Sequence, residues 1–157
     1  MESAALLHDI DKLVSVKPEV GGLPHGEGSA DWLSRHGFAE LAPVVVGHPV
    51  SRLADGAWFE GWLKTASPEA LILAYADKRA GQRLESMAVR FGSWERRYPP
   101  DARAGRARGS WTPETLEEVW RRAETIELLV CEQAGVTPDE VRRLLWTGGA
   151  LRSARGI

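Results

Sequence analysis

Apolar residues recur every three or four positions along most of this chain, the spacing that gathers them on one face of an α-helix. The spacing predicts helices over residues 3–13, 30–35, 44–48, 58–65, 68–89, 113–134 and 141–146. We find no segment with the period-two alternation typical of a half-buried strand. The valine-rich segment 44–48 could also form a buried strand, but prolines at both of its ends favour a short helix. The pattern therefore predicts an all-α fold, with six to seven helices around one core.

Helix-start and helix-stop residues support several of these boundaries. Ser67 and Thr112 each stand before a proline and a glutamate, the order of an N-cap, a first-turn proline and an acid near the positive end of the helix dipole. Thr137 repeats this start signal with a capping box, and Gly135 is placed to end the long helix before it. We also expect Ser29 to cap the helix that follows it.

The composition is that of an ordinary folded domain. With 157 residues and 27% charged residues, the chain is long enough for one core and too balanced for global disorder. We expect one helical domain over residues 1–149 and a flexible tail over 150–157. The single cysteine, Cys131, cannot form an internal disulfide, which indicates a buried position and a cytoplasmic protein. No apolar segment approaches the roughly 20 residues that cross a bilayer, so no membrane partner is expected.

The charge pattern bears on nucleic-acid binding. A net charge of −2 and a pI near 6.1 argue against a general nucleic-acid-binding protein, which is usually basic. Residues 92–110 form an irregular, arginine-rich segment in which Trp94 and Tyr98 could stack on bases. The arginines could instead stay solvated or pair with the acids of the following helix, and the slightly acidic chain favours this second interpretation.

A histidine and an aspartate stand side by side near the start of the chain, in the segment LHDIDK. On a helix over residues 3–13, His8 and Asp9 lie at the edge of an apolar stripe, and Lys12 shares their side of the helix. A partly desolvated imidazole and carboxylate offer one nitrogen and one oxygen donor to a divalent cation. This corner is therefore a candidate metal site that needs further ligands from elsewhere in the chain.

The further candidates are His25, in a glycine-rich loop, His48, at the end of the valine-rich segment, and Asp77, which follows an apolar run. A carboxylate at an inward position must be paired or must bind a metal. The fourth histidine, His36, stands at a predicted helix end, where the helix dipole stabilises an imidazolium, so we interpret it as structural. Asp11 is interpreted as a solvated residue on the helix surface. The alternative is that it orients the histidine three residues before it.

Histidines and aspartates thus follow one another in a characteristic order on successive predicted helices. They are the pair His8-Asp9, then His25, then His48, then the pair Asp77-Lys78. In this order the chain resembles the HD-domain metal-dependent phosphohydrolases, from about residue 3 to about residue 95. The resemblance implies a single-domain HD-type helical bundle with one or two divalent metal ions at its centre. It also implies a first ion bound by His8, Asp9 and Asp77, and a second ion, bridged by Asp9, bound by His25 and His48.

The chain departs from that family in two places. Members usually have a further histidine some tens of residues before the His-Asp pair. This chain begins seven residues before His8, so we expect the family's N-terminal helix and its ligand to be missing. Members also often have a glycine where Asp11 stands.

Imidazole and carboxylate donors without sulfur suit Mn²⁺, Fe²⁺, Co²⁺, Ni²⁺ or Zn²⁺. Such an ion lowers the pKa of its bound water to roughly 7 and so supplies hydroxide at neutral pH. Positioned cations stabilise phosphoryl oxygens, and Lys12 and Lys78 are the candidates for this substrate-binding role. We therefore expect hydrolysis of a phosphate ester, such as a phosphorylated small molecule, a nucleotide or a phosphodiester, with Asp9 and Lys12 as catalytic residues. The alternative is an HD-like module with impaired catalysis that binds a nucleotide or a protein partner.

Overall fold

The computed structural model describes residues 1–80, 84–97 and 111–141, and within these ranges it is helical, with no strand beyond an isolated bridge between Ala80 and Leu84. The predicted all-α, single-domain helical bundle is confirmed. The α-helices are α1 (Glu2–Leu7), α2 (Glu27–Arg35), α3 (Ala42–Val45), α4 (Gly56–Thr65), α5 (Pro68–Arg79), α6 (Met87–Arg97), α7 (Pro113–Ala134) and α8 (Pro138–Val141). Short 3₁₀ helices follow α1, α2 and α3, namely η1 (Ile10–Lys12), η2 (Ala39–Leu41) and η3 (Val50–Ala54).

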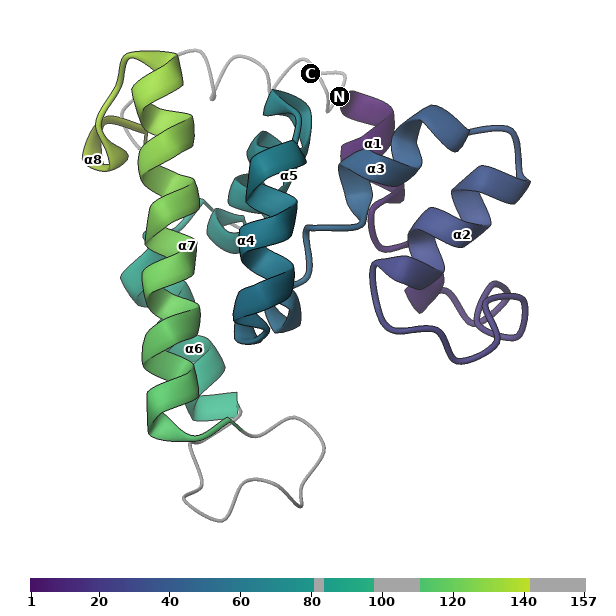
Figure 1. Cartoon of the computed structure of the whole chain (residues 1–157), viewed down its shortest axis with the longest axis horizontal. Helices are drawn as coiled ribbons and strands as arrows, with labels where there is room; N and C mark the ends of the chain where they lie inside the picture. The colour runs from purple at the N-terminus through teal and green to yellow at the C-terminus, as the bar shows by residue number, and fades with distance from the viewer. Residues whose placement is uncertain (81–83, 98–110, 142–157) are drawn as a thin grey trace, which may run out of the picture.

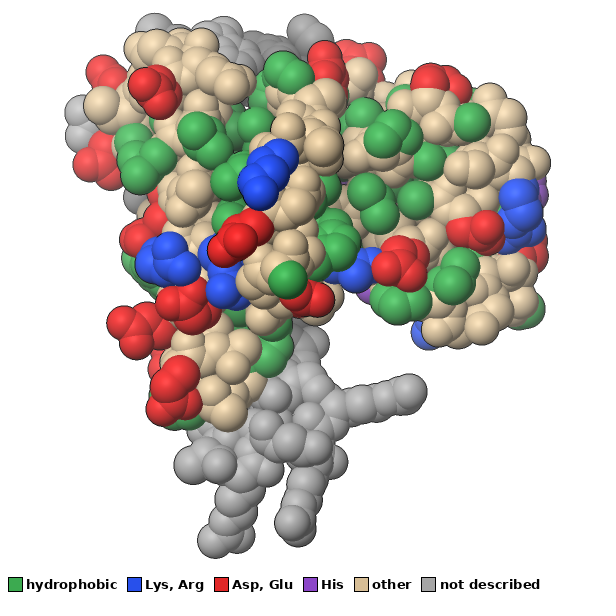
Figure 2. All heavy atoms as spheres, in the orientation of Figure 1, with side chains coloured by type: hydrophobic (Ala, Val, Ile, Leu, Met, Phe, Trp, Pro, Cys, Tyr) green, Lys and Arg blue, Asp and Glu red, His purple; other side chains and the backbone are tan. Residues whose placement is uncertain are grey.

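Helix α5 lies in the middle of the bundle (Figure 1). It packs against the long helix α7 on one side and against α3 on the other, and α3 in turn contacts α2. On the face drawn in Figure 2, hydrophobic and charged side chains are mixed, and hardly any histidine side chain is visible. The amino-terminal helices and the α7 side of the molecule are therefore joined through α5.

Two groups of buried apolar residues meet on α5. The larger packs α4, α5, α6 and α7 together and includes Phe59, Phe91 and Ile126. The smaller joins α1, α2 and α3 to α5 and consists of Ala4, Leu33, Val45 and Leu73. Because α5 contributes Leu73 to the smaller group and Tyr75 to the larger one, this single helix holds the two groups together.

The predicted helix-start and helix-stop residues are confirmed at most positions. The hydroxyl groups of Ser67 and Thr112 each accept a hydrogen bond from the amide three residues later, as N-caps do. At the start of α8, the Glu140 carboxylate accepts from the Thr137 amide at 2.7 Å and the Thr137 hydroxyl accepts from the Glu140 amide, which is a capping box. Gly135 ends α7 in the left-handed region, with φ of 66°.

Several predicted helix boundaries are wrong. Helix α5 ends at Arg79 instead of continuing to residue 89. A separate helix, α6, covers Met87–Arg97, so the first residues of the segment that we predicted to be irregular from residue 92 are helical. Ser29 does not cap α2, because that helix starts earlier, at Glu27, and buries the Ser29 side chain. The predictions for the arginine-rich segment beyond residue 97, for the last helix beyond residue 141 and for the tail at 150–157 lie outside the described residues.

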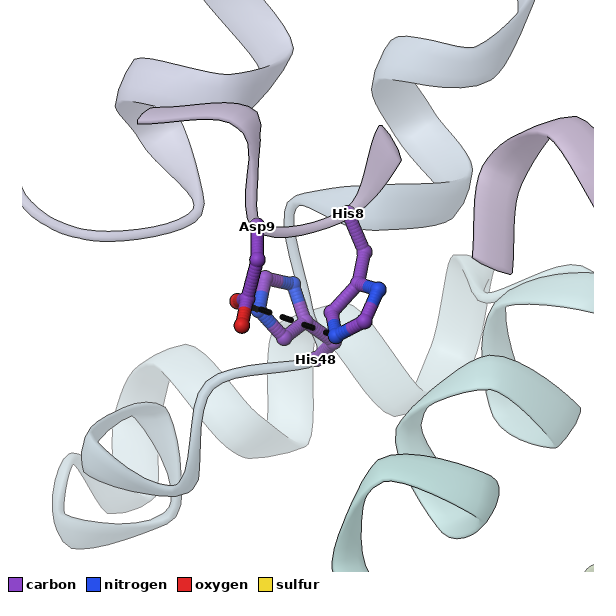
Figure 3. A group of neighbouring side chains, drawn as sticks. All are labelled: His8, Asp9 and His48. Carbon is purple, nitrogen blue, oxygen red and sulfur yellow. Dashed lines mark hydrogen bonds and ion pairs between the residues drawn. The ribbon is translucent and has the colours of Figure 1, made fainter. Parts of the chain in front are cut away.

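The first predicted helix, over residues 3–13, is interrupted. Helix α1 ends at Leu7, and η1 begins only after His8 and Asp9. The His8 ring donates from Nδ1 to the Ala5 carbonyl at 2.7 Å, and so occupies the oxygen that would accept the Asp9 amide in a continuous α-helix. The interruption leaves His8 and Asp9 in a turn, with their side chains directed to the same region (Figure 3).

Candidate metal centre

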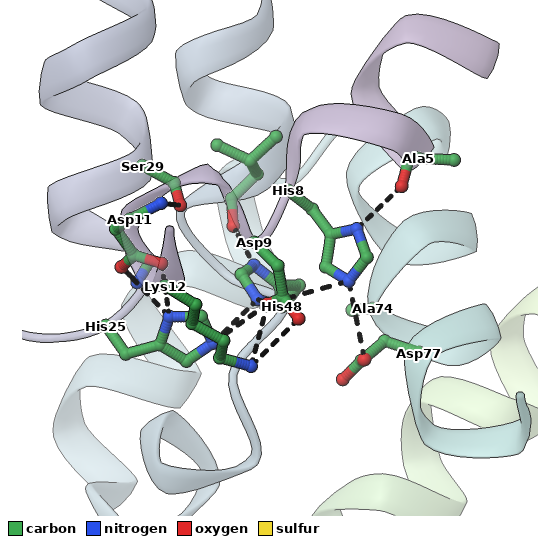
Figure 4. A network of polar contacts seen from close by, with 12 residues as sticks. Ala5, His8, Asp9, Asp11, Lys12, His25, Ser29, His48, Ala74 and Asp77 are labelled. Atoms are coloured by element: carbon green, nitrogen blue, oxygen red, sulfur yellow. Dashed lines mark hydrogen bonds and ion pairs between the residues drawn. The ribbon is translucent and has the colours of Figure 1, made fainter. Parts of the chain in front are cut away.

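The carboxylate of Asp9 is the centre of a cluster whose members come from separate parts of the chain (Figure 4). Its oxygen Oδ1 lies 3.2 Å from His25 Nε2, 3.2 Å from His48 Nε2 and 3.7 Å from His8 Nε2. His8 Nε2 also lies 3.6 Å from Oδ1 of Asp77, on α5. The structure therefore brings together all five residues that the sequence suggests as metal ligands.

His25 and His48 belong to two loops that touch each other. Gly26, which follows His25, has φ of 87°, and a Cβ at this position would lie 2.7 Å from Cγ of Pro49. A side chain at Gly26 would therefore push the two loops apart. Without it, His25 Nε2 and His48 Nε2 approach to 3.1 Å.

The second nitrogen of each imidazole is already hydrogen-bonded. His8 and His48 donate from Nδ1 to backbone carbonyls at 2.7 and 2.6 Å, and His25 donates from Nδ1 to the Asp11 carboxylate at 2.9 Å. Carbonyl and ionised carboxylate oxygens only accept, so each Nδ1 carries a proton and a neutral ring keeps its lone pair on Nε2. All three Nε2 atoms then face Asp9 as acceptors.

Such a cluster of acceptors is repulsive unless a proton or a metal cation lies among them. The Nε2 atoms of His25 and His48 are 3.1 Å apart, and both also lie close to the ionised Asp9 carboxylate. His48 is 1% exposed, which makes a positive charge on its own ring costly. The ligand atoms of His8, Asp9 and His48 all lie within 4.8 Å of one another, so this group could hold a metal ion (Figure 3).

The protonation states of Asp9 and His48 suit a cation. Burial raises the pKa of Asp9, but its contacts with His25, His48 and Lys12 outweigh burial and hold the pKa below its ordinary value. Burial lowers the pKa of His48, so its ring is neutral at pH 7. The centre thus combines an ionised carboxylate with a buried, neutral imidazole.

His8 and His25 have pKa values shifted the other way. The nearby Asp77 carboxylate raises the pKa of His8 against the opposing effect of burial. Burial lowers the pKa of His25, but its contacts with Asp9 and Asp11 outweigh burial, and the pKa is raised. Protons therefore compete with a metal ion for these two rings.

Lys12, which we predicted to bind phosphate, lies beside the cluster. Its Nζ is 2.9 Å from both carboxylate oxygens of Asp9, and its side chain is 57% exposed. The Lys12 side chain therefore lies next to the candidate ligands and is more than half exposed.

Lys78, the second predicted substrate-binding cation, has a different position. Its side chain has no exposed surface, and Nζ donates to the carbonyls of His48 at 2.8 Å and Ala74 at 3.2 Å. Burial lowers the pKa of this ammonium to about 8. A fully buried group is not placed to contact a substrate, which corrects the predicted role. Lys78 instead ties the turn that carries His48 to α5.

The neighbouring Arg79 is also buried. Its Nη1 lies 2.6 Å from Oε1 of Glu127, on α7, and donates to the Tyr75 hydroxyl at 2.8 Å. This buried ion pair fixes the end of α5 against α7. The sequence pattern did not indicate it, because its two partners are 48 residues apart.

Two other sequence interpretations have clear outcomes. Asp11 is not the solvated residue that we predicted, since it is 8% exposed, and its partner is His25 rather than His8. No local sequence pattern indicated this burial; in the structure Gly28 packs against Asp11, and a Cβ at Gly28 would lie 3.1 Å from Cβ of Asp11. His36 lies outside the cluster and stacks on the Trp32 ring with centroids 4.0 Å apart, as a structural histidine would.

Comparisons of the chain with protein-family models, with curated proteins and with solved structures found no match. Among the described residues, no helix has the length and apolar character needed to cross a membrane. The case for a function therefore rests on the chemistry of the cluster. The group of His8, Asp9 and His48 could hold a metal ion, and it offers imidazole and carboxylate donors without sulfur.

Proposed function

We propose that this protein is a metal-dependent hydrolase of phosphate esters, with a phosphorylated small molecule, a nucleotide or a phosphodiester as substrate. The observation that carries the proposal is the convergence of three imidazole Nε2 atoms on Asp9, two of them 3.1 Å apart. A divalent cation is the natural partner of such a set of acceptors. The likeness of the ligand order to that of HD-domain phosphohydrolases supports the same conclusion.

The candidate ligands divide into two overlapping sets. His8, Asp9 and Asp77 would hold one ion, and Asp9, His25 and His48 would hold a second. When bound, the metal supplies hydroxide from its water at neutral pH and positive charge near the phosphoryl oxygens.

The remaining chemistry belongs to the protein's own side chains. Asp9 stays ionised because its pKa is held low, and therefore remains a ligand even in mildly acidic solution. Lys12 is long, exposed and next to Asp9, so its ammonium can contact a phosphoryl oxygen at the edge of the centre and offset its negative charge.

Asp9→Asn tests the proposal, because it removes the shared anionic ligand with little change in shape. We expect loss of Mn²⁺- or Ni²⁺-dependent hydrolysis of p-nitrophenyl phosphate and bis(p-nitrophenyl) phosphate, and loss of metal-induced stabilisation. The matched control is Asp31→Asn, whose carboxylate pairs with Arg35 on the surface of α2 and should leave both properties unchanged. Metal-loaded wild-type protein that hydrolyses no compound in a broad panel of phosphate esters would refute the proposed activity.

One observation favours a second candidate, a module with impaired catalysis that binds a nucleotide or a protein partner. The Lys12 ammonium already neutralises both oxygens of Asp9, so part of the cluster is stable without a metal ion. This candidate predicts that Mn²⁺ and Ni²⁺ leave the melting temperature unchanged. A ligand that binds the native state at 100 times its Kd should instead add about 2.7 kcal/mol to the free energy of unfolding.

A further inference from the structure

Asp11 is a buried carboxylate at the edge of the metal centre. It lies in η1, two residues after Asp9, and is 8% exposed. Its oxygens Oδ1 and Oδ2 lie 3.0 and 2.9 Å from His25 Nδ1, and Oδ2 also accepts from the Gly26 amide at 3.1 Å. In Figure 4, the Asp11 carboxylate contacts the His25 ring on the side away from Asp9.

The first turn of α2 fixes the position of this carboxylate. A Cβ at Gly28 would lie 3.1 Å from Cβ of Asp11 and 3.2 Å from its Oδ2, closer than ordinary contact. The Ser29 hydroxyl accepts from the Asp11 amide at 3.4 Å. An ionised carboxylate is costly to bury unless it is paired, and here its partners are a ring N–H, a backbone N–H and the Ser29 side chain. Asp11 is therefore held in one position against His25.

We propose that Asp11 is a positioning residue for His25, which keeps the ring proton on Nδ1 so that Nε2 presents its lone pair to the centre. The role as a metal-ligand positioner rests on the proposed function. His8 and His48 are oriented by neutral backbone carbonyls, whereas His25 is oriented by a charged side chain. A carboxylate partner fixes the tautomer of a histidine ligand and makes its other nitrogen a stronger donor to the metal.

Asp11→Asn tests this role with little change in shape. The Gly26 amide requires an acceptor at the Oδ2 position, so the asparagine places its carbonyl oxygen there and its NH₂ group at the Oδ1 position, 3.0 Å from His25 Nδ1. The carbonyl oxygen would still lie 2.9 Å from Nδ1, but it is neutral, and the NH₂ group only donates, so together they hold the proton on Nδ1 less strongly than the carboxylate does. Any shift of the proton to Nε2 removes the lone pair that His25 would offer to a metal ion.

The first measurement is the tautomer of His25 in metal-free protein, read from ring nitrogen chemical shifts at a pH where the ring is neutral. We expect Nδ1–H in the wild type and a shift toward Nε2–H in Asp11→Asn. His48 keeps its Nδ1 contact with a carbonyl in both proteins and is the internal reference. The second measurement is the Kd for Ni²⁺, which we expect to rise about 10–100-fold in the variant.

Asp31→Asn is the matched control, because it makes the same change at a surface carboxylate that pairs with Arg35. It should leave the His25 tautomer and the Kd for Ni²⁺ unchanged. A wild-type His25 in the Nε2–H form, or an Asp11→Asn protein with wild-type tautomer and wild-type Kd, would overturn the inference. If Asp11→Asn does not fold, the wild-type tautomer still decides the question.

Failure of the proposed function has a different signature. Wild-type protein that binds no Ni²⁺ or Mn²⁺ but keeps His25 as Nδ1–H would refute metal-dependent hydrolysis. The same result would support the orienting contact between Asp11 and His25, because that contact is measured in metal-free protein.

Discussion

Gly47 precedes His48 and lies directly against the indole of Trp62. A Cβ at Gly47 would lie 2.6 Å from Cζ2 of Trp62 and closer still to Cε2 and Nε1. Carbon atoms pack best about 3.5–4.0 Å apart, so Gly47→Ala must separate the turn from the indole by about 1 Å. Neither side moves freely, because Trp62 is 8% exposed and stacks on Trp58, and the His48 carbonyl is bonded to Lys78.

Overpacking of this kind costs about 1–3 kcal/mol. For a domain of this size, about 2–4 °C of melting temperature is lost per kcal/mol, so we expect a fall of about 2–12 °C in chelator, measured by circular dichroism. His48 moves with its neighbour, and we expect the Kd for Ni²⁺ to rise about 10–100-fold, the range for residues that orient metal ligands.

Gly61→Ala is the matched control for this experiment. Gly61 is an exposed residue of α4, and a Cβ there would have no other atom within 4 Å. Alanine should stabilise the helix by up to about 1 kcal/mol and leave the Kd unchanged. Wild-type melting temperature and Kd in Gly47→Ala would refute the reasoning. A lower melting temperature with an unchanged Kd would show that the contact with Trp62 stabilises the fold without positioning His48.

The remaining predictions concern pH, the buried ion pair and the exposed lysine. Because the pKa values of His8 and His25 lie above 6.5 in the folded protein, the native state binds more protons than the unfolded state between that value and the raised pKa. As the pH rises through this window, the melting temperature in chelator should therefore fall while the affinity for Ni²⁺ rises. If both quantities instead changed in the same direction with pH, the raised pKa values of His8 and His25 would be contradicted. Arg79→Met leaves the buried Glu127 carboxylate without its cationic partner and should lower the free energy of unfolding, measured with urea, by about 3–5 kcal/mol. A change below about 1 kcal/mol would show that the ion pair is not isolated from water. Lys12→Met should raise the KM for a phosphate ester without weakening Ni²⁺ binding, and an unchanged KM would exclude Lys12 from substrate contact.

The sequence indicated the members of the candidate centre better than it indicated their surroundings. Helix boundaries at Ser67, Thr112 and Gly135 were predictable because capping depends on residues within one turn. The interruption after Leu7 was not, because it depends on an imidazole that takes a backbone carbonyl from the helix. Periodicity describes which face is apolar, and it does not describe competition of a side chain for the backbone.

The buried charges were the main failure of the sequence interpretation. Lys78 and Arg79 end an apolar helix, and a lysine and an arginine in such a place are usually exposed. Lys78 is buried because its acceptor is the His48 carbonyl, 30 residues earlier, and Arg79 because Glu127 lies on a different helix. Contacts between residues so far apart in the sequence produce no local sequence pattern from which they could be predicted.

Helix α5 makes the geometry of the candidate metal centre depend on packing far from it. The same twelve residues supply apolar side chains to both buried groups, the ammonium that holds the His48 turn, and the carboxylate of Asp77. A cavity made far away, for example by Ile126→Ala on α7, would loosen this helix and let Asp77 drift from His8. A metal ion bound as proposed should then dissociate faster before any helical signal is lost, so its exchange rate would report early damage to the core.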